Sequence, residues 1–204
     1  LSETTVSLAA FDAMGHGLSA AVLVAVMIVV VVLVVSFVRR PMPDRGEDVA
    51  LTGLSGTVTV VRDERAVPQI YADDARDLFR AQGYVQAQDR FFEMDLRRHI
   101  TEGRLSELVG ANDEALRADA VVRTLGWRRV AQEELGLLSP TTREYLDAFS
   151  DGVNDYLRGR SASELSVSYT LLARANPLPQ IEPWEPADSL AWLKAMAWDL
   201  RSNY

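Results

Sequence analysis

The sequence predicts an α+β protein that is mostly helical, carries two short strands, and is preceded by one transmembrane helix. Three patterns predict this arrangement. An apolar run without charged residues covers positions 20–38, apolar and polar residues alternate over positions 56–62, and apolar residues recur at helical spacing through much of the remainder. We therefore divide the chain into an N-terminal segment over residues 1–40, a linker over 41–55 and a domain over 56–204.

Composition excludes several functional classes. The 204 residues carry a formal net charge of -8, which argues against a nucleic-acid partner because such a partner requires a basic face. There is no cysteine, so disulfides, thiolate metal sites and a cysteine nucleophile are excluded. Only His16 and His99 are present, which leaves almost no material for a histidine-based triad or a multi-histidine metal site.

The apolar run is long enough to span a bilayer. A helix from about residue 18 to residue 38 supplies the roughly 20 apolar residues that the hydrocarbon core requires. A secretory signal peptide is the alternative, but its apolar region usually has about 7–15 residues and is followed by small residues. Here Arg39, Arg40 and Pro41 follow, so we expect an uncleaved helix that contacts membrane lipid.

Charges beside this helix bear on its orientation. Arg39 and Arg40 follow it and Glu3 and Asp12 precede it, and basic residues normally stay cytoplasmic, which would place the domain inside the cell. The sequence begins at Leu1 rather than methionine, so we expect upstream residues, and basic residues there would reverse this count.

The segment after the linker supplies the strands. Val58 and Val60 lie on one face of the alternating stretch, residues 69–72 form a second strand candidate, and residues 63–68 are predicted to connect the two as in a hairpin. Two strands do not form a stable sheet alone, so we expect them to pair with strands from elsewhere.

Helices make up the rest of the domain. An aspartate at 73–74 caps a long helix with one apolar stripe over residues 78–96, and another helix starts at 112–113. A serine–proline pair begins a third helix over 139–159, which ends at a glycine, and the last helix covers about 186–200.

An ordered series of short motifs covers essentially all of residues 56–204. The series consists of Val58-x-Val60-x-Arg62-Asp63-Glu64-x-x-Val67-Pro68-x-Ile70-Tyr71-Ala72, Asp77-Leu78, Ala81-Gln82-Gly83-Tyr84-Val85-Gln86-Ala87-Gln88-Asp89-Arg90-Phe91-Phe92-Glu93-Met94-Asp95, Arg97-Arg98, Gly103-Arg104-Leu105-Ser106-Glu107-Leu108, Asp119-x-x-x-Arg123-x-x-Gly126, Glu182-Pro183-Trp184-x-Pro186-x-Asp188-Ser189 and Met196-Ala197-Trp198-Asp199-Leu200. In order and spacing it resembles the α chain of the penicillin acylase family, whose members are N-terminal nucleophile hydrolases. Ala66, Gln69 and Gln86 depart from the glycine or histidine that is usual at those positions, and they look like scaffold variations.

The resemblance implies an αββα core that a β chain, cut from the same precursor, completes. In this family the N-terminal serine of the β chain is the nucleophile, its own α-amine serves as base, and β-chain groups hold the oxyanion. No catalytic residue is therefore expected in this chain, which would be active only with its β chain. The implied reaction is cleavage of the amide bond of an N-acylated small molecule, such as a β-lactam or an acyl-homoserine lactone.

The resemblance also assigns three candidate substrate-binding residues to the last helix. Met196 keeps the residue type that lines the acyl pocket in this family, whereas Asp199 and Leu200 replace an arginine and a phenylalanine. The ordinary interpretation of Trp192, Met196 and Trp198 is that they are core residues, and both interpretations stay open at this point.

Charged residues of alternating sign crowd the long helix and its continuation. They are Asp89, Arg90, Glu93, Asp95, Arg97, Arg98, Arg104 and Glu107. We expect a salt-bridged helix that is largely solvated or faces a partner, with Glu93 and Arg97 spaced for an ion pair. We expect His99 to lie on the surface rather than in a catalytic site.

Two further expectations follow from the resemblance. One structural calcium ion would be bound mainly by the β chain, with one acidic α-chain ligand that should fall beyond Tyr204, and no organic cofactor is expected. Family members are typically exported, so we expect the domain outside the cytoplasmic membrane despite the basic pair. The alternative function is a membrane-tethered, non-catalytic accessory or interaction subunit that retains the acylase scaffold.

Overall fold

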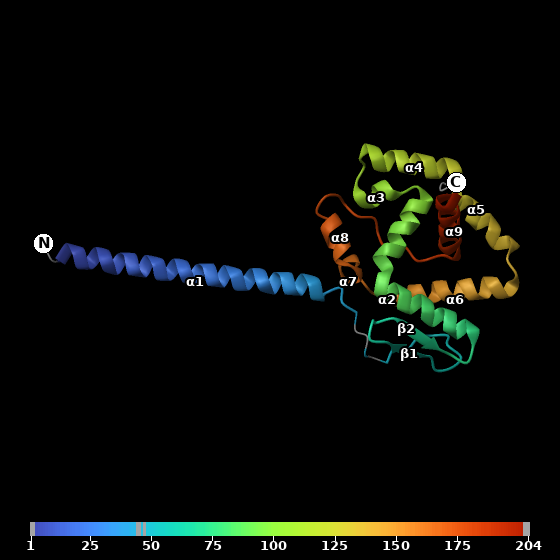
Figure 1. Ribbon diagram of the computed structural model, residues 1–204, viewed down its shortest axis with the longest axis horizontal. Coiled ribbons are helices and arrows are strands. Elements are labelled where there is room, and N and C mark those ends of the chain that lie inside the picture. Colours follow the sequence, from blue (N-terminus) through green and yellow to red (C-terminus); the bar gives the residue numbers. More distant parts are fainter. Residues whose placement is uncertain (1–2, 44–45, 47, 202–204) are drawn as a thin grey trace. The chain divides into compact units, whose positions relative to one another are not determined.

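The computed structural model describes residues 3–43, 46 and 48–201, which form two compact units, Leu1–Pro41 and Met42–Tyr204 (Figure 1). Parts of the predicted N-terminal segment, linker and domain, namely residues 1–2, 44–45, 47 and 202–204, lie outside the described residues.

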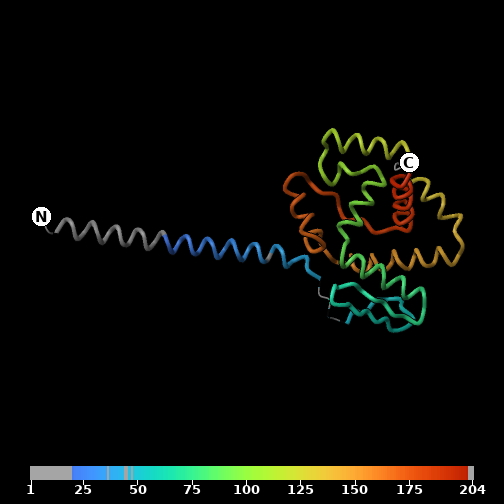
Figure 2. The backbone as a smooth tube through the Cα atoms, viewed as in Figure 1, coloured from blue at the N-terminus to red at the C-terminus, as the bar shows by residue number. Residues whose placement is uncertain are grey.

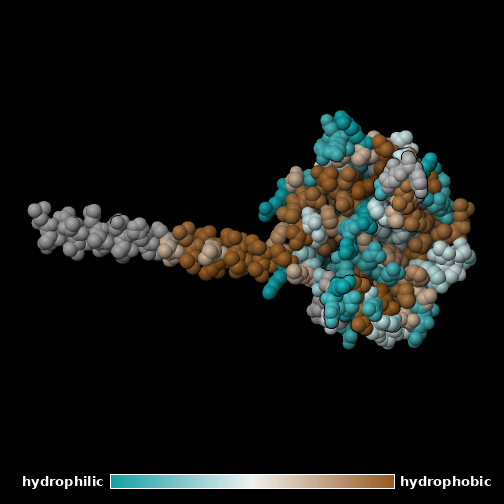
Figure 3. All heavy atoms as spheres, viewed as in Figure 1, coloured by the Kyte–Doolittle hydropathy of each residue, from teal (hydrophilic) through white to brown (hydrophobic). Residues whose placement is uncertain are grey.

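The first unit is a single helix, α1, from Glu3 to Arg39. Its segment Ala20–Arg39 is long and apolar enough to cross a membrane by length and composition. The apolar side chains of residues 20–35 are exposed, and they form the continuous hydrophobic surface seen along this helix in Figure 3. A membrane anchor and a signal sequence near the N-terminus both meet this description.

The second unit is mostly helical, as predicted, and Figure 2 follows its chain from the hairpin to the last helix. Its elements in chain order are β1 (Thr59–Arg62), β2 (Pro68–Tyr71), α2 (Ala75–Glu102), α3 (Leu105–Val109), α4 (Asp113–Leu125), α5 (Trp127–Glu134), the 3-10 turn η1 (Leu135–Leu137), α6 (Pro140–Leu157), α7 (Ala162–Leu165), α8 (Val167–Leu172) and α9 (Pro186–Arg201).

The two strands form an antiparallel hairpin in which Thr59 pairs with Tyr71 and Arg62 with Pro68. Asp63 closes the turn, because its Oδ1 accepts the backbone N–H groups of residues 65 and 67 at 2.9 Å each. Ala66 has a φ of 61°, a left-handed conformation that costs a residue with a Cβ roughly 1–2 kcal/mol. The family's usual glycine would avoid that cost at this position.

Short polar side chains begin the main helices, as predicted. Asp74 accepts the N–H groups of residues 76 and 77 at the start of α2, Asn112 accepts that of Ala115 at α4, and Ser139 accepts that of Thr142 at α6. Each cap is local, which is why the sequence alone indicates it.

Helix α2, which carries the predicted apolar stripe, has a kink at Arg90, where φ is -147° and ψ is 30°. Before the kink, Ala81 and Val85 are buried as predicted. Beyond it Phe91 and Met94 are buried, and the two predicted stripe residues there are partly buried and pack against the core.

Helices α2 and α6 pack more extensively than any other pair of elements, and two glycines permit it. A Cβ at Gly152 would lie 1.8 Å from the carbonyl oxygen of Arg80, and a Cβ at Gly83 would lie 2.0 Å from that of Phe149. The backbones are therefore in direct contact. A buried ion pair, Arg80 Nη2 to Asp155 Oδ2 at 2.7 Å, lies beside this contact.

Changing Gly152→Ala is therefore expected to destabilise the protein. Alanine gains about 0.5–1 kcal/mol in a helix interior, but overpacking against rigid backbone costs up to about 3 kcal/mol, so the net change is a loss. Chemical unfolding of the complete protein measures this. Gly136→Ala is the matched control, since nothing lies within 4 Å of a Cβ there. Equal stability of both variants would contradict the backbone contact.

Candidate functional site

The candidate site is built on α9, whose start is fixed by its sequence and by α6. Pro186 occupies the first helical turn, where a missing N–H costs nothing. Asp188 Oδ2 accepts the backbone N–H of Glu185 at 2.8 Å, which caps the helix. Just before it, the side chain of Asn154 bonds both the N–H and the carbonyl of Trp184, at 2.7 and 3.0 Å.

The first half of α9 is buried. Ala187, Leu190 and Ala191 form a small apolar cluster with Ala131 of α5. The second half carries exposed apolar side chains instead. Their exposed fractions are Leu193 57%, Met196 44%, Trp198 51% and Leu200 66%.

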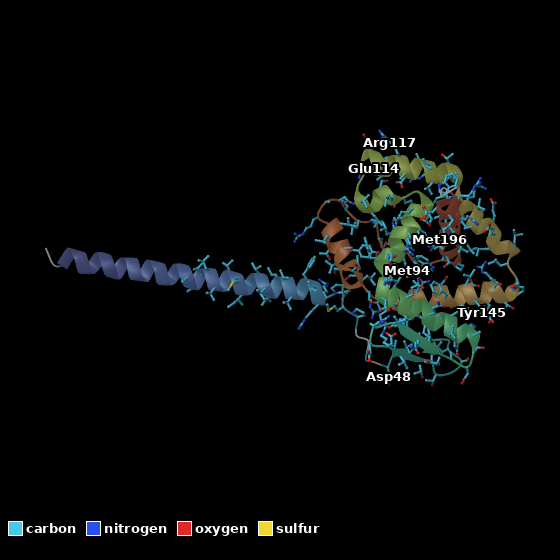
Figure 4. All side chains as sticks on the ribbon, in the orientation of Figure 1. Asp48, Met94, Glu114, Arg117, Tyr145 and Met196 are labelled. Atoms are coloured by element: carbon cyan, nitrogen blue, oxygen red, sulfur yellow. The ribbon has the colours of Figure 1, made fainter. Side chains whose placement is uncertain are left out.

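Three of these exposed side chains lie on one face of α9. Leu193, Met196 and Leu200 are separated by three and then four residues, so they form a continuous row, here called the α9 stripe. Asp199, also exposed, lies one turn from Met196 on the same side. The structure therefore places the three predicted substrate-binding residues together on one surface, and Figure 4 labels Met196 on this helix.

Neither Met196 nor Trp198 belongs to the core of this chain. Both are about half exposed among the described residues, so their interpretation as core residues of this chain is wrong. Trp192 is partly buried beneath the guanidinium of Arg97, which lies 4.5 Å from its ring centre. A row of exposed apolar side chains of this kind is typical of a surface that contacts a partner or a ligand.

A shallow hollow of about 290 Å³ lies between α5 and α9, and no residue of the α9 stripe lines it. Trp127 and Trp198 form part of its wall, with ring centres 6.3 Å apart, and Lys194 and Arg201 lie at its edge. A larger hollow of about 440 Å³ lies under residues 48–52, but no residue of α9 lines it. We assign the candidate site to α9 because the exposed apolar row and the three predicted substrate-binding residues lie on it.

Beneath α9 lies a buried cluster of charged side chains on α2, which the sequence did not predict. Asp95 accepts hydrogen bonds from Arg98 Nη2 and from the hydroxyl of Tyr169, each at 2.5 Å. His99 Nδ1 lies 2.8 Å from the carbonyl oxygen of Asp95 and 3.3 Å from its Oδ1. Burial opposes ionisation of Asp95, but the contacts with His99 and Arg98 outweigh it and hold the pKa of Asp95 below its usual range.

Two sequence expectations for this helix are wrong. His99 is 3% exposed rather than a surface residue, and although burial alone would lower its pKa, the contact with Asp95 raises it. The helix is also not largely solvated, because Asp95 and Arg98 are buried. The predicted pair of Glu93 and Arg97 is confirmed.

Arg98 links this cluster to the segment that leads into α9. Its Nη1 donates to the carbonyl oxygens of Glu182 at 3.1 Å and Pro183 at 2.9 Å, and it lies 3.9 Å from Asp188 Oδ2. The guanidinium also lies 5.6 Å from the ring centre of Trp184. One side chain of α2 thereby reaches four residues around the start of α9.

Arg128 of α5 approaches the same carboxylate from the other side. Its Nη1 lies 3.2 Å from Asp188 Oδ1, and it also pairs with Glu102 and Glu185 at 2.9 and 2.6 Å. Despite both arginines, burial dominates and raises the pKa of Asp188 to about 6. Asp95, Arg98 and Asp188 lie within the family-like motifs, but the pairing of Arg98 with Asp188 across some 90 residues of sequence is not visible in a linear pattern.

The described residues of this chain offer no ligand set for the calcium ion that the resemblance implies. The part of the chain that the structure describes contains no group of three or more His, Asp or Glu side chains that could hold a metal ion. Its ligands would have to come from elsewhere, and we derive no step through it.

Comparison with known proteins identifies the class. Residues 57–204 match the sequence model of the penicillin amidase family, so the chain belongs to that family. It also has a penicillin-acylase-like fold. A thermostable penicillin G acylase from Alcaligenes faecalis superimposes on it with a TM-score of 0.62 at 29% identity, covering 72% of this chain and 75% of that one.

Curated relatives share this assignment. Penicillin acylase 2 proenzyme from Pseudomonas sp. is 38% identical over 155 residues, which is 76% of this chain and 19% of the relative. The acyl-homoserine lactone acylase QuiP of Pseudomonas syringae pv. tomato is 34% identical over 154 residues, 75% of this chain and 18% of the relative. The chain thus spans less than a fifth of the length of either relative.

Proposed function

We propose that this chain is the α chain of a self-processed, heterodimeric amidohydrolase. The observation that carries the proposal is the match of residues 57–204 to the family, together with a relative that is named as a proenzyme and is about four times as long as this chain. The β chain, cut from the same precursor, would supply an N-terminal serine as nucleophile and its own α-amine as base. A structural calcium ion would likewise be held mainly by that chain.

The proposed substrate is an N-acylated small molecule. The relatives are named for penicillins and for acyl-homoserine lactones, which share an amide that joins an acyl group to a polar head. The α9 stripe suits the acyl group, because burying apolar groups there removes them from water at about 0.8 kcal/mol per CH₂. This chain would therefore bind and orient the acyl group, and exclude water from it, while the bond is cleaved on the β chain.

The whole precursor tests this proposal. Expression of the full-length gene should give two co-purifying chains, the larger beginning with serine, and the pair should hydrolyse N-acyl amides. Replacing that serine with alanine should leave a single uncut and inactive polypeptide. N-terminal sequencing, mass spectrometry and amine release measure these outcomes. A folded pair that hydrolyses no N-acyl amide would favour the accessory-subunit alternative.

We also propose that α1 anchors the enzyme and that the domain lies outside the cytoplasmic membrane. Helix α1 is long enough to cross a bilayer, whereas Arg39 and Arg40 argue for the opposite orientation. Protease added to intact spheroplasts should digest the domain, and a cytoplasmic marker protein should survive. Full protection until lysis would contradict the proposed location, and release into the medium without α1 would show a cleaved signal sequence.

Met196 is proposed to contact the acyl group. Changing Met196→Ala enlarges the pocket, so the ratio of kcat/KM between long and short acyl chains should change by about 10–200-fold. Met94→Ala is the matched control, because Met94 is a 5% exposed core residue (Figure 4). Its loss should cost about 2–5 kcal/mol of stability and slow every substrate alike. An unchanged acyl preference in the Met196 variant would exclude it from the pocket.

A further inference from the structure

The first turn of α9 carries one buried carboxylate that faces two other helices. Asp188 is 3% exposed. Its Oδ2 caps α9 by accepting the Glu185 N–H, and lies 3.9 Å from Arg98 of α2. Its Oδ1 lies 3.2 Å from Arg128 of α5. The direction in which α9 leaves this point therefore depends on the two charges that bear on a single side chain.

The α9 stripe lies further along the same helix, so a change in the direction of the first turn displaces it. Met196 follows Asp188 by eight residues, which is about 12 Å along a helix axis. A tilt of only about 5° at the first turn would move Met196 by roughly 1 Å over that length. Misplacement by 1 Å can cost about 100-fold in rate when it disturbs a substrate-positioning group.

We propose that Asp188 is a positioning residue that sets the direction of α9, and with it the acyl-chain selectivity of the α9 stripe. It touches no substrate itself, and it acts through the helix it caps. The inference rests on the proposed function, since it assigns a cause to the selectivity of that same site.

The charge of Asp188 matters to this role, and not only its shape. The groups that face it are Arg98 and Glu102 of α2, Arg128 of α5, and Glu185 before α9. Burial raises the pKa of Asp188 to about 6, so it is ionised at pH 7.5 and largely protonated at pH 5. Protonation would remove the charge of Asp188, and with it the attraction to both arginines that bears on the first turn of the helix.

The substitution Asp188→Asn separates charge from shape. Asparagine can still accept the Glu185 N–H through its amide oxygen, but it carries no charge to attract the arginines. In the complete processed enzyme, we expect the ratio of kcat/KM for a long over a short N-acyl substrate to change by about 10-fold at pH 7.5. At pH 5 the wild-type ratio should approach that of the variant, whose own ratio should hardly vary with pH.

Asp119→Asn is the matched control. Asp119 is also buried, at 4% exposed, and it caps a helix by accepting the N–H groups of Leu105 and Ser106, at the start of α3. The control should lower the melting temperature without changing the selectivity ratio. If Asp188→Asn yields no folded enzyme, Arg128→Gln removes one of the two charges that face Asp188 from a partly exposed position, and the selectivity ratio at pH 7.5 should again change.

The outcomes are distinct. A uniform fall in activity with a lower melting temperature and an unchanged ratio at both pH values would show that Asp188 is only structural, and would overturn the inference. A wild-type enzyme that hydrolyses no substrate in the series would instead contradict the proposed function and, with it, this inference.

Discussion

Direct backbone contact between α2 and α6 is the constraint on which the rest of the domain depends. Gly83 and Gly152 let the two longest helices of the domain meet without side chains between them. The pair of Arg80 and Asp155 can then form beside the contact, excluded from water by both helices. A buried pair of this kind contributes little net stability, because desolvation offsets much of the attraction, but a mismatched arrangement would leave a charge unpaired. It therefore favours one register of α2 on α6 over its neighbours.

With α2 fixed, its second half becomes the platform for the candidate site. The kink at Arg90 turns the helix so that Phe91 and Met94 fill the core and Asp95 and Arg98 lie under α9. Arg98 is held by Asp95 on its own helix, which leaves its remaining donors directed at the segment before α9. The position of α9 relative to α2 is therefore fixed by hydrogen bonds from Arg98. Apolar contacts alone would tolerate sliding.

How much the sequence reveals depends on how local each feature is. The hairpin and the caps at Asp74, Asn112 and Ser139 need only a few neighbouring residues, so they could be predicted. The kink at Arg90 has no proline or glycine to mark it, and the prediction missed Phe91 and Met94, the buried apolar residues beyond it. The burial of His99 was missed because its charged neighbours indicated solvent, whereas partners such as Tyr169, 74 residues beyond Asp95, enclose the cluster. Resemblance placed Met196 on the candidate surface, but it could not indicate what orients that surface.

Helix α9 divides its roles along its axis rather than around it. Ala187, Asp188 and Leu190 are buried in the first half, while Met196 and Leu200 are exposed in the second. A helix of this kind shows only a weak apolar face by periodicity, although both of its halves are specialised. This division suits a site formed together with a second chain. The hydrogen bonds and ion pairs that hold the first half of α9 all come from this chain. Covering the exposed apolar half removes it from water, which is favourable, and a rigid helix loses little conformational entropy when a substrate or a second chain covers it.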